Sequence, residues 1–468
     1  MDNRKQIMQK KWIERAFVVF VWLAIWQVAA WCIHNEILFA GPVTTMQYLG
    51  NMLIRVGFWQ TCALSLLRIG TGFLLALICG CLLGMAALKW HMAEKLLSPF
   101  LLFCKAVPVA SFAVIFLIWW GADGISLAIC FLVTLPVVYV NFLEGMRNVD
   151  EKLLQMAGVF RISRRAMFLS LYRPALAPFM AGCFKTALGM GIKAGVAAEV
   201  IGISNRSIGG EIYLSKIYLD TAGVFAWTIV VIVLSFGIEK GVLALWNRFC
   251  RMRVSVPVKK QMHREKACGI TFSGLCKSYG QQVVLNDVSA TVRAGEVCCL
   301  MAPSGAGKTT LLHILAGLVK PDTGRVSAGC EEPVGVSGTI ALSPAMVFQE
   351  DRLCEEETAL QNVMLTGCGR QEAAECLGRL LPPEALHKPV KALSGGMRRR
   401  VCIARALVAE GNVLLLDEPF SGLDDETKRQ VIEVIRIYQK DRAIILATHE
   451  EKDIEIFAGR KVEITPTR

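Results

Sequence analysis

The sequence is poor in charged residues: Asp, Glu, Lys and Arg together make up 19% of its 468 residues, while 54% are hydrophobic. This imbalance argues against a chain that is soluble throughout and favours a membrane region joined to a soluble one. The net charge of +12 would suit a nucleic-acid ligand, but no module of interleaved aromatic and basic residues is present. The basic residues cluster beside apolar segments instead, so we expect contact with membrane lipid and no nucleic acid as a partner.

Zinc-binding CxxC motifs are also absent, although the chain contains 17 cysteines. Pairs of such motifs would indicate a structural zinc site. The cysteines are odd in number and are scattered through apolar segments, which does not suggest a disulfide framework. We interpret them as free, mostly buried thiols of a protein that faces a reducing compartment.

The N-terminal apolar run lacks the small residues of a signal-peptide cleavage site. It extends from Ala16 to Ile33 after a polar and basic start, and it has about the length of a bilayer span. Trp26, Gln27 and Trp31 near its end do not suit cleavage. We therefore expect a retained first membrane helix.

Five further apolar segments predict an all-α membrane domain of six helices over residues 1–250. They cover residues 61–88, 98–120, 125–146, 175–203 and 223–246. Basic residues follow the second and fourth segments, whereas the loops on the other side contain few. Because basic loops stay in the cytoplasm, this alternation places the N-terminus inside and returns the chain to the cytoplasm near Arg248.

The composition changes after the sixth segment. Residues 251–267 are rich in Lys and Arg and predict a linker. From residue 268 to residue 468, short apolar runs alternate with helical patterns, which indicates an α/β domain.

A phosphate-binding loop lies early in this α/β domain. An apolar run ends at Met301, an apolar helical pattern begins at Leu311, and the loop residues between them are Ser304, Gly305, Ala306, Gly307, Lys308, Thr309 and Thr310. Glycines let successive N–H groups point at phosphate oxygens. Lys308 would bind the β- and γ-phosphates of ATP and Thr309 would bind Mg²⁺, so we predict a P-loop NTPase with these two cofactors. The usual pattern opens with glycine, and this sequence has Ala302 there.

Further motifs follow in the order found in ABC transporter ATPases, and the α/β half resembles that family. They are Lys277-Ser278-Tyr279-Gly280, Val347-Phe348-Gln349, Leu393-Ser394-Gly395-Gly396-Met397, the apolar run Val413 to Leu416 with Asp417 and Glu418, Ser421-Gly422-Leu423-Asp424, and Thr448-His449. The signature at Ser394 separates ABC ATPases from other phosphate-loop enzymes. Met397 stands where the family has glutamine, and we expect this change to weaken function without abolishing it.

The resemblance implies a role for each of these motifs. Tyr279 would stack on adenine, Gln349 would touch Mg²⁺ or the attacking water, and Asp417 would hold Mg²⁺. Glu418 would be the general base and His449 the switch histidine, so both are predicted catalytic residues together with Gln349. Ser394, Gly395 and Gly396 would bind the γ-phosphate held by a partner subunit, and Asp424 belongs to the D-loop beside the nucleotide.

The connection between the fourth and fifth apolar segments resembles the EAA loop of ABC importer permeases of the nitrate/sulfonate/taurine group. The matching residues are Asp150, Ala157, Ser163, Phe168, Pro174 and Pro178. In that family the loop forms a coupling helix that docks on the ATPase, which would place the helix at about 150–165 here. Gln155 replaces the family's glutamate and Arg161 its glycine, which puts the usual sharp bend in doubt.

Three ionisable residues lie within the fifth apolar segment. Lys185 is expected to reach towards the cytoplasm, Glu199 lies near the outer end, and Lys193 is nearest the middle. Lys193 would either help an anion through the membrane or form a polar contact between helices.

Together the resemblances imply a half-transporter that acts as a homodimer, because ABC ATP sites form between two subunits. They imply ATP-driven import of a small solute, nitrate-, sulfonate- or taurine-like or a vitamin precursor, which a separate extracytoplasmic substrate-binding protein delivers. The expected location is the bacterial-type inner membrane, with the N-terminus and the ATPase in the cytoplasm. Two alternatives stay open: an ABC exporter, which the short cytoplasmic loops disfavour, and an ATP-binding regulatory or scaffold protein, which Glu418 and His449 disfavour.

Overall fold

The computed structural model describes residues 2–251, 268–303, 305–329, 342–439, 441–457 and 459–463. The chain forms two compact units. One consists of Met1–Asn148 and Ala175–Met252, and the other of Val149–Pro174 and Arg253–Arg468. The connection that resembles the EAA loop thus packs with the α/β half. Apart from Arg251, the predicted linker lies outside the described residues.

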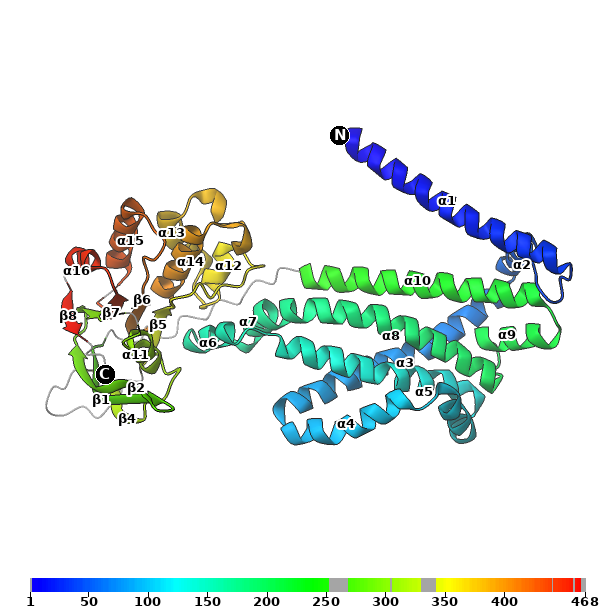
Figure 1. Cartoon of the computed structure of the whole chain (residues 1–468), viewed down its shortest axis with the longest axis horizontal. Coiled ribbons are helices and arrows are strands. Elements are labelled where there is room, and N and C mark those ends of the chain that lie inside the picture. Colours follow the sequence, from blue (N-terminus) through cyan, green and yellow to red (C-terminus); the bar gives the residue numbers. More distant parts are fainter. Residues whose placement is uncertain are drawn as a thin grey trace. The chain divides into compact units, whose positions relative to one another are not determined.

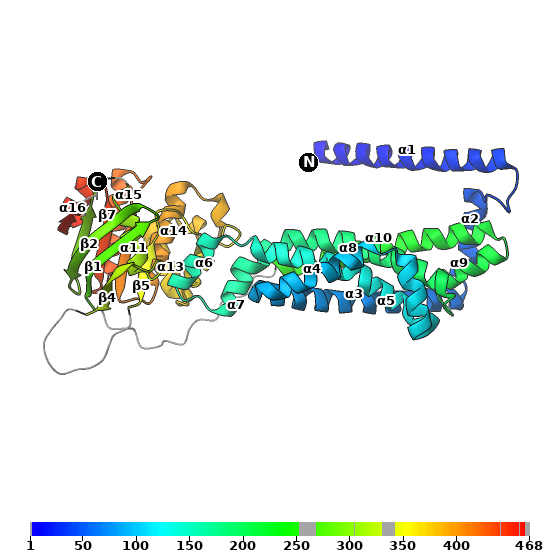
Figure 2. The ribbon, with the colours of Figure 1, turned by 60° about the horizontal axis from the view of Figure 1, so that its bottom comes forward.

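The first unit is helical in its described residues, and Figures 1 and 2 both show α3, α8 and α10 running side by side. Its helices are α1 (Asp2–Ile33), α2 (Pro42–Leu53), α3 (Val56–Lys89), α4 (His91–Ala106), α5 (Val109–Arg147), α8 (Arg173–Gly202), α9 (Ile208–Ile217) and α10 (Thr221–Arg251). An apolar core joins α2, α3, α5, α8, α9 and α10, and Ile69, Ile192 and Trp227 are buried in it. Helix α5 approaches α3 closely because Gly72 has no side chain: a Cβ there would lie 2.4 Å from the carbonyl oxygen of Leu127.

The third predicted membrane segment, residues 98–120, is not one continuous helix. Helix α4 ends at Ala106 and α5 begins at Val109, with Val107 in an extended conformation. Proline disfavours the helical conformation of the residue before it and has no N–H to donate, which explains the break at Pro108. A second bend follows at Gly121, where φ is 70°.

Five helices among the described residues are long and apolar enough to cross a membrane. They contain residues Ala16–Ile33, Val56–Lys89, Val109–Arg147, Arg164–Gly202 and Thr221–Arg251. With 16 residues, α4 is about 24 Å long at 1.5 Å per residue. That is shorter than the hydrocarbon core of a typical bilayer, which is about 30 Å thick.

The second unit contains two sheets and the helices around them (Figure 2). Its helices are α6 (Glu151–Val159), α7 (Arg164–Met167), η1 (Phe168–Tyr172), α11 (Lys308–Leu315), α12 (Ala359–Met364), α13 (Arg370–Leu380), η2 (Pro383–Ala385), η3 (Val390–Ala392), α14 (Gly395–Val408), α15 (Asp425–Tyr438) and α16 (Glu451–Phe457). Its strands are β1 (Ile270–Tyr279), β2 (Gln282–Val292), β3 (Val297–Met301), β4 (Thr323–Ala328), β5 (Pro344–Val347), β6 (Val413–Asp417), β7 (Ala443–Thr448) and β8 (Arg460–Glu463).

The larger sheet has the strand order β5-β6-β7-β3-β8, and its neighbouring strands are parallel. Strands β6 and β7 are buried along their whole length, as continuous apolar runs in a parallel sheet require. The smaller sheet is antiparallel with the order β2-β1-β4. These arrangements confirm the predicted α/β fold of the second half.

Helix α6 ends in a sharp bend at Arg161, although this residue is not a glycine. Its φ is 48°, in the left-handed region. The amide of Ile162 donates to the carbonyl of Ala157 at 2.9 Å and the amide of Arg161 donates to Gly158 at 3.1 Å. This pair of bonds is the Schellman motif, in which glycine is the usual left-handed residue. Arg161 therefore forms the bend that its identity had put in doubt, at the cost of local strain.

An Arg161→Gly variant should hold this bend more firmly. A residue with a Cβ in the left-handed conformation costs about 1 kcal/mol relative to glycine, so removing the side chain should slow exchange of the Ile162 amide about fivefold. Hydrogen exchange of the full-length chain measures this. Arg161→Ala is the matched control, because it also removes the guanidinium but keeps the strained Cβ. Equal exchange in the two variants would show that the backbone is not strained there.

Candidate functional site

The loops that carry the predicted motifs meet at one edge of the large sheet. The phosphate loop follows β3, Gln349 follows β5, Glu418 follows β6 and His449 follows β7. Since these strands are parallel, their carboxyl ends lie together, and Asp417 pairs with Ala447 while Met301 pairs with Thr448. The carboxyl edge of such a sheet is where ligands bind in open α/β folds. The topology thus brings four motifs that are far apart in sequence to one place.

The phosphate loop has the backbone that its glycines predict. Gly305 and Gly307 have φ values of 85° and 89°. A Cβ on Gly307 would lie 2.8 Å from Leu285 of β2, so this position excludes other residues for two reasons. The side chain of Lys308 folds back and donates to the carbonyl oxygen of Ala302. Ala306 is buried, Thr309 and Thr310 lie in the first turn of α11, and Ser304 lies outside the described residues.

Ala302 carries no backbone strain. The non-glycine residues with positive φ in the described part are His34, Arg161, Ile203, Arg206, Leu219, Asp287, Glu418 and Asp441, and Ala302 is not one of them. Since a positive φ is the main reason that a loop position requires glycine, the backbone at Ala302 gives no reason for glycine there.

Asp417 ends β6 beside the phosphate loop and is almost completely buried. Burial raises the pKa of its carboxyl to about 6, although a hydrogen bond from the Thr309 hydroxyl opposes the shift. Its Oδ2 atom is buried and has no hydrogen-bond partner in the described part of the chain. A bound cation would supply that partner and favour the charged carboxylate. Mg²⁺ takes few protein ligands beside phosphates, so the Asp417 carboxylate and the Thr309 hydroxyl fit it.

Glu418 and His449 face each other across the ends of β6 and β7. His449 Nδ1 lies 3.4 Å from Glu418 Oε1. The backbone of Glu418 has a φ of 45°, and its amide donates to the carbonyl of Ala447 at 2.9 Å. A non-glycine residue held in this conformation often marks a functional site. The pair places a carboxylate and an imidazole within reach of one water molecule, as general-base chemistry requires.

A charged cluster that the sequence did not suggest lies behind His449. Lys428 of α15 donates to Glu450 at 2.5 Å, and the Thr448 hydroxyl donates to Asp453 at 2.7 Å. The bond from Lys428 to Glu450 raises the pKa of the lysine, and burial raises the pKa of Asp453. The cluster ties the first turn of α15 to the loop that carries His449.

The signature motif forms the start of α14. Ser394 is its N-cap and accepts a hydrogen bond from the amide of Met397 at 3.3 Å. Ser394 and Gly395 are exposed, which leaves the N-terminus of this helix open to an anion. A Cβ on Gly396 would lie 3.3 Å from Leu423, so the D-loop packs against the signature. Asp424 caps α15 by accepting from Thr427, and these bonds lower its pKa.

Arg399 is another functional residue that the sequence motifs did not indicate. It lies on α14 and is 3% exposed. Its guanidinium donates to five main-chain carbonyls at 2.6–3.2 Å, those of Phe348, Gln349, Asp417, Glu418 and Pro419. The positive charge therefore holds the loop of Gln349 and the end of β6 in one arrangement.

The side chains of Tyr279 and Gln349 are exposed. Tyr279 ends β1 opposite Gln282, in the hairpin whose second strand contacts Gly307 through Leu285. Gln349 follows β5, and its carbonyl accepts from Arg399. Gln349 directly precedes the residues of the docking surface described next.

Helix α6 packs against the residues that follow Gln349. Lys152 lies 2.6 Å from Glu350, and Arg352 donates to Gln155 at 2.9 Å. The same guanidinium lies over the ring of Phe348, 4.0 Å from its centroid. Gln155, which replaces a glutamate of the family pattern, thus still accepts a bond from an arginine.

A second arginine completes this α6 docking surface. Arg405 of α14 donates to the carbonyl of Arg352 at 2.6 Å and lies over Phe160, 4.9 Å from the ring centroid. Asp150 and Ser163, two residues of the EAA-like pattern, cap α6 and α7. The pattern therefore specifies where these helices begin, and the arginines specify where α6 docks.

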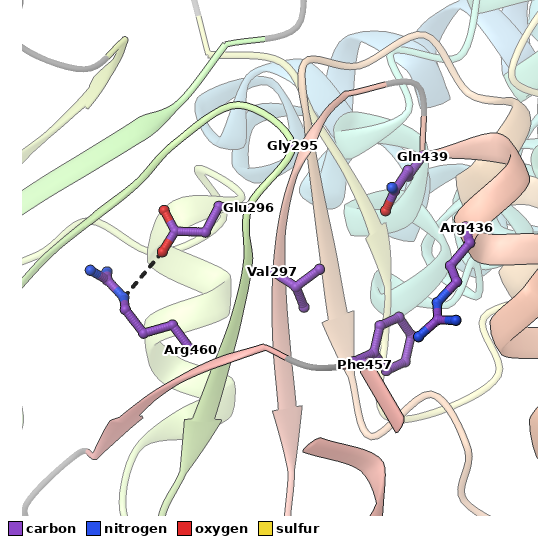
Figure 3. Close-up of a pocket in the computed structure, with 7 residues that line it drawn as sticks. All are labelled: Gly295, Glu296, Val297, Arg436, Gln439, Phe457 and Arg460. Atoms are coloured by element: carbon purple, nitrogen blue, oxygen red, sulfur yellow. Dashed lines mark ion pairs between the residues drawn. The ribbon is translucent and has the colours of Figure 1, made fainter. Parts of the chain in front are cut away.

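A polar pocket of about 480 Å³ lies at the other edge of the same sheet (Figure 3). Gly295, Glu296 and Val297 line it at the amino end of β3, whereas the phosphate loop follows the carboxyl end. Arg460 pairs with Glu296 at 3.2 Å on one wall. The pocket is thus separate from the nucleotide edge.

Two family models match the chain. The family described as "ABC transporter" matches residues 285–421 of the α/β half. The family described as "Binding-protein-dependent transport system inner membrane component" matches residues 72–239, which run from α3 to α10.

Curated relatives match the α/β half. The aliphatic sulfonates import ATP-binding protein SsuB 1 of Rhodococcus jostii is 37% identical over 42% of this chain and 79% of that protein. The Nod factor export ATP-binding protein I of Rhizobium sp. is 35% identical over 41% of this chain and 66% of that protein. The phosphonates import ATP-binding protein PhnC 1 of Natronomonas pharaonis is 36% identical over 42% of this chain and 91% of that protein. A bacterial ABC transporter cassette solved as a dimer is 26% identical with a TM-score of 0.36, over 42% of this chain and 94% of that one.

Proposed function

The chain belongs to the ABC transporter family, as a binding-protein-dependent permease domain fused to an ATPase domain, and we propose that it imports a small anionic solute. It is a multi-pass inner-membrane protein, and its ATP hydrolysis is coupled to transport. Two relatives of the ATPase half are named for sulfonate and phosphonate import, which supports an oxyanion as the solute. The permease match to binding-protein-dependent systems favours import over export and implies a separate extracytoplasmic binding protein.

In this proposal the residues at the carboxyl edge of the sheet bind and hydrolyse ATP. The loop from Gly305 to Thr310 binds the phosphates, and Tyr279 stacks on the base. Thr309 and Asp417 hold Mg²⁺, which supplies positive charge to the phosphates when bound. Glu418 accepts a proton from the attacking water, while His449 orients that water and Gln349 approaches the same place from the docking surface.

The ATP sites form between two copies of the chain. Ser394 and Gly395 present the exposed N-terminus of α14, and its N–H groups and dipole favour an anion there. We place the γ-phosphate of the partner copy's ATP against it. A closed two-fold dimer supplies two such sites, because each copy then gives its phosphate loop to one site and its signature to the other.

The observation that carries the proposal is the docking of α6 on the residues after Gln349. Movements of the Gln349 loop on ATP binding reach α6 through Arg352, and α6 connects directly to the helices of the membrane unit. In this proposal the coupling passes from the Gln349 loop to α6 through packed side chains of the second unit. In this proposal the ATPase and the N-terminus lie in the cytoplasm.

Reconstituted transport tests the proposal. The full-length chain is placed in lipid vesicles with a binding protein from the same cell, whose ligand is identified by thermal shift against sulfonates, phosphonates and nitrate. We expect the liganded binding protein to stimulate ATP hydrolysis. The labelled ligand should accumulate on the side of the membrane opposite to the binding protein. Outward movement of the ligand that needs no binding protein would instead identify an exporter, and hydrolysis without any transport would identify a regulator.

An Arg352→Ala variant should uncouple hydrolysis from transport. Removing the guanidinium deletes the bond to Gln155 and the contact with Phe348, whereas the phosphate loop and Glu418 stay in place. Coupling free energies of 1–3 kcal/mol predict that stimulation by the binding protein falls about fivefold or more, with basal hydrolysis retained. Arg370→Ala, which changes an exposed arginine at the start of α13, is the control. Unchanged stimulation would show that Arg352 does not carry the coupling.

A further inference from the structure

One face of α8 carries small, polar and positively charged side chains, although the helix can cross a membrane. Its exposed residues recur every three or four positions, which is the spacing of a single helix face. From the middle to the outer end they are Gly182, Lys185, Thr186, Met190, Lys193, Ala197 and Ile201. The opposite face packs into the protein, where Phe184, Leu188 and Ile192 are each 5% exposed.

The exposed faces of the neighbouring membrane helices are different. Those of α3 and α10 are rich in large apolar side chains, among them Leu67, Leu75, Leu82, Ile232 and Phe236, although Lys240 of α10 is also exposed. Such faces suit contact with lipid. The α8 face differs in that its largest side chains end in charged groups, which lipid solvates poorly.

Beyond its first residue, the buried Arg173, α8 has its basic residues on the exposed face and its acidic residue on the buried face. The acidic residue Glu199 is fully buried, and its Oε2 accepts from the Ser65 hydroxyl at 2.9 Å and from the Gly209 amide at 3.1 Å. Lys185 and Lys193 lie on the exposed face, about 12 Å apart along the helix axis. Within the described residues, neither lysine has a hydrogen-bond or ion-pair partner. The polar contact between helices that was the alternative for Lys193 is therefore not formed inside this unit.

We infer that the α8 face lines a water-filled path for the solute and that Lys185 and Lys193 select anions there. The inference rests on the proposed import of an anion and names the residues that recognise it. Charge complementarity favours an anion as the solute. The exposed face carries two cationic side chains and the Thr186 hydroxyl, whereas Glu199, the one acidic residue of the helix, lies on the buried face. In the proposed dimer, the α8 faces of two copies bound the path.

The reactivity of a cysteine on this face tests the inference. Met190→Cys places a thiol between the two lysines in the full-length chain, and Leu75→Cys places one on the apolar face of α3. Both native side chains are 45% exposed, so the two positions are matched in accessibility. The probes are 2-sulfonatoethyl and 2-(trimethylammonio)ethyl methanethiosulfonate, an anion and a cation, applied to open membrane fragments. Mass spectrometry of the peptide with the new cysteine separates its rate from those of the native thiols.

We expect Met190→Cys to react much faster than Leu75→Cys. The ratio of its reaction rate with the anionic reagent to that with the cationic reagent should exceed the same ratio for a free thiol in water by about tenfold or more. Lys193→Gln, added to Met190→Cys, should remove most of this preference. The Met190→Cys and Leu75→Cys variants should each keep the ATP hydrolysis rate of the parent chain, which verifies their fold. A thiol at position 190 as inert as that at position 75 would show that lipid or a second copy covers the face. A preference that is absent, or unaffected by Lys193→Gln, would show that the lysines do not select anions.

This assay and the transport assay fail independently, because labelling requires neither a binding protein nor ATP hydrolysis. Anion-selective labelling without ligand uptake would leave the anion path standing and overturn the proposed import. Uptake of a sulfonate or phosphonate with an inert α8 face would keep the import and overturn the path.

Discussion

A Glu418→Gln chain should bind ATP as tightly as the unaltered chain and hydrolyse it about 10²- to 10⁴-fold more slowly. Glutamine keeps the size and the strained backbone of Glu418 but cannot accept a proton from water. Its amide also stays beside His449, which lies 3.4 Å from the carboxylate in the structure. Binding of a fluorescent ATP analogue and steady-state phosphate release measure the two effects on the full-length chain.

His449→Ala is the matched comparison for this result. It removes the other half of the pair and leaves the carboxylate, so hydrolysis should fall while some general-base activity remains. A Glu418→Gln chain that hydrolyses ATP at the parental rate would remove Glu418 from the mechanism. It would also revive the interpretation as an ATP-binding scaffold if the parental rate itself proved negligible.

The second large effect is expected for Arg399→Met. Methionine has a similar length but removes the guanidinium donor from five main-chain carbonyls, those of Phe348, Gln349, Asp417, Glu418 and Pro419; the Glu418 carbonyl keeps another donor, the Ser421 amide. Breaking such a buried charge network costs about 3–5 kcal/mol. We expect the ATPase domain to lose about that much stability against opening, as measured by hydrogen exchange of the full-length chain.

The same variant should separate binding from turnover. None of the five hydrogen bonds of the Arg399 guanidinium goes to the phosphate loop. The KM for ATP should therefore change little. The carbonyls that Arg399 holds flank Glu418, and displacing a catalytic group by about 1 Å lowers kcat about 100-fold. Arg398→Met is the control, since the guanidinium of Arg398 donates to Val390 and Lys391 instead. Arg399→Lys should restore part of the stability. Equal losses in Arg398→Met and Arg399→Met would show a general effect on α14 without a positioning role.

Local motifs were predictable because their chemistry is contained in a few consecutive residues. Glycine residues at positions 305 and 307 indicate that the loop needs positive φ there, and the structure has positive φ at both positions. Asp417 and Glu418 end an apolar run, which places them at a strand end whatever the rest of the chain does. Asp150 and Ser163 matched the EAA-like pattern, and in the structure both cap a helix.

Predictions failed where one residue competes with its surroundings. The apolar run 98–120 satisfies the hydropathy criterion for a span, but Pro108 breaks it because sterics at Val107 outweigh the apolar pattern. Arg161 seemed unsuited to a sharp bend, yet two backbone hydrogen bonds hold it in the left-handed region. In each case the outcome depends on free energies that composition does not report.

The sequence by itself determined the class of the protein: a membrane-embedded half, an α/β ATPase half, and the ordered motifs that bind ATP. It could do so because periodicity and short motifs encode local structure and local chemistry. Only the tertiary structure decided that Arg399, Arg352 and Lys428 tie distant loops together, and that Lys193 and Glu199 of one helix face opposite ways. These facts depend on contacts between residues far apart in the chain, and a lysine or arginine in the sequence looks the same whether it is buried in such a contact or exposed.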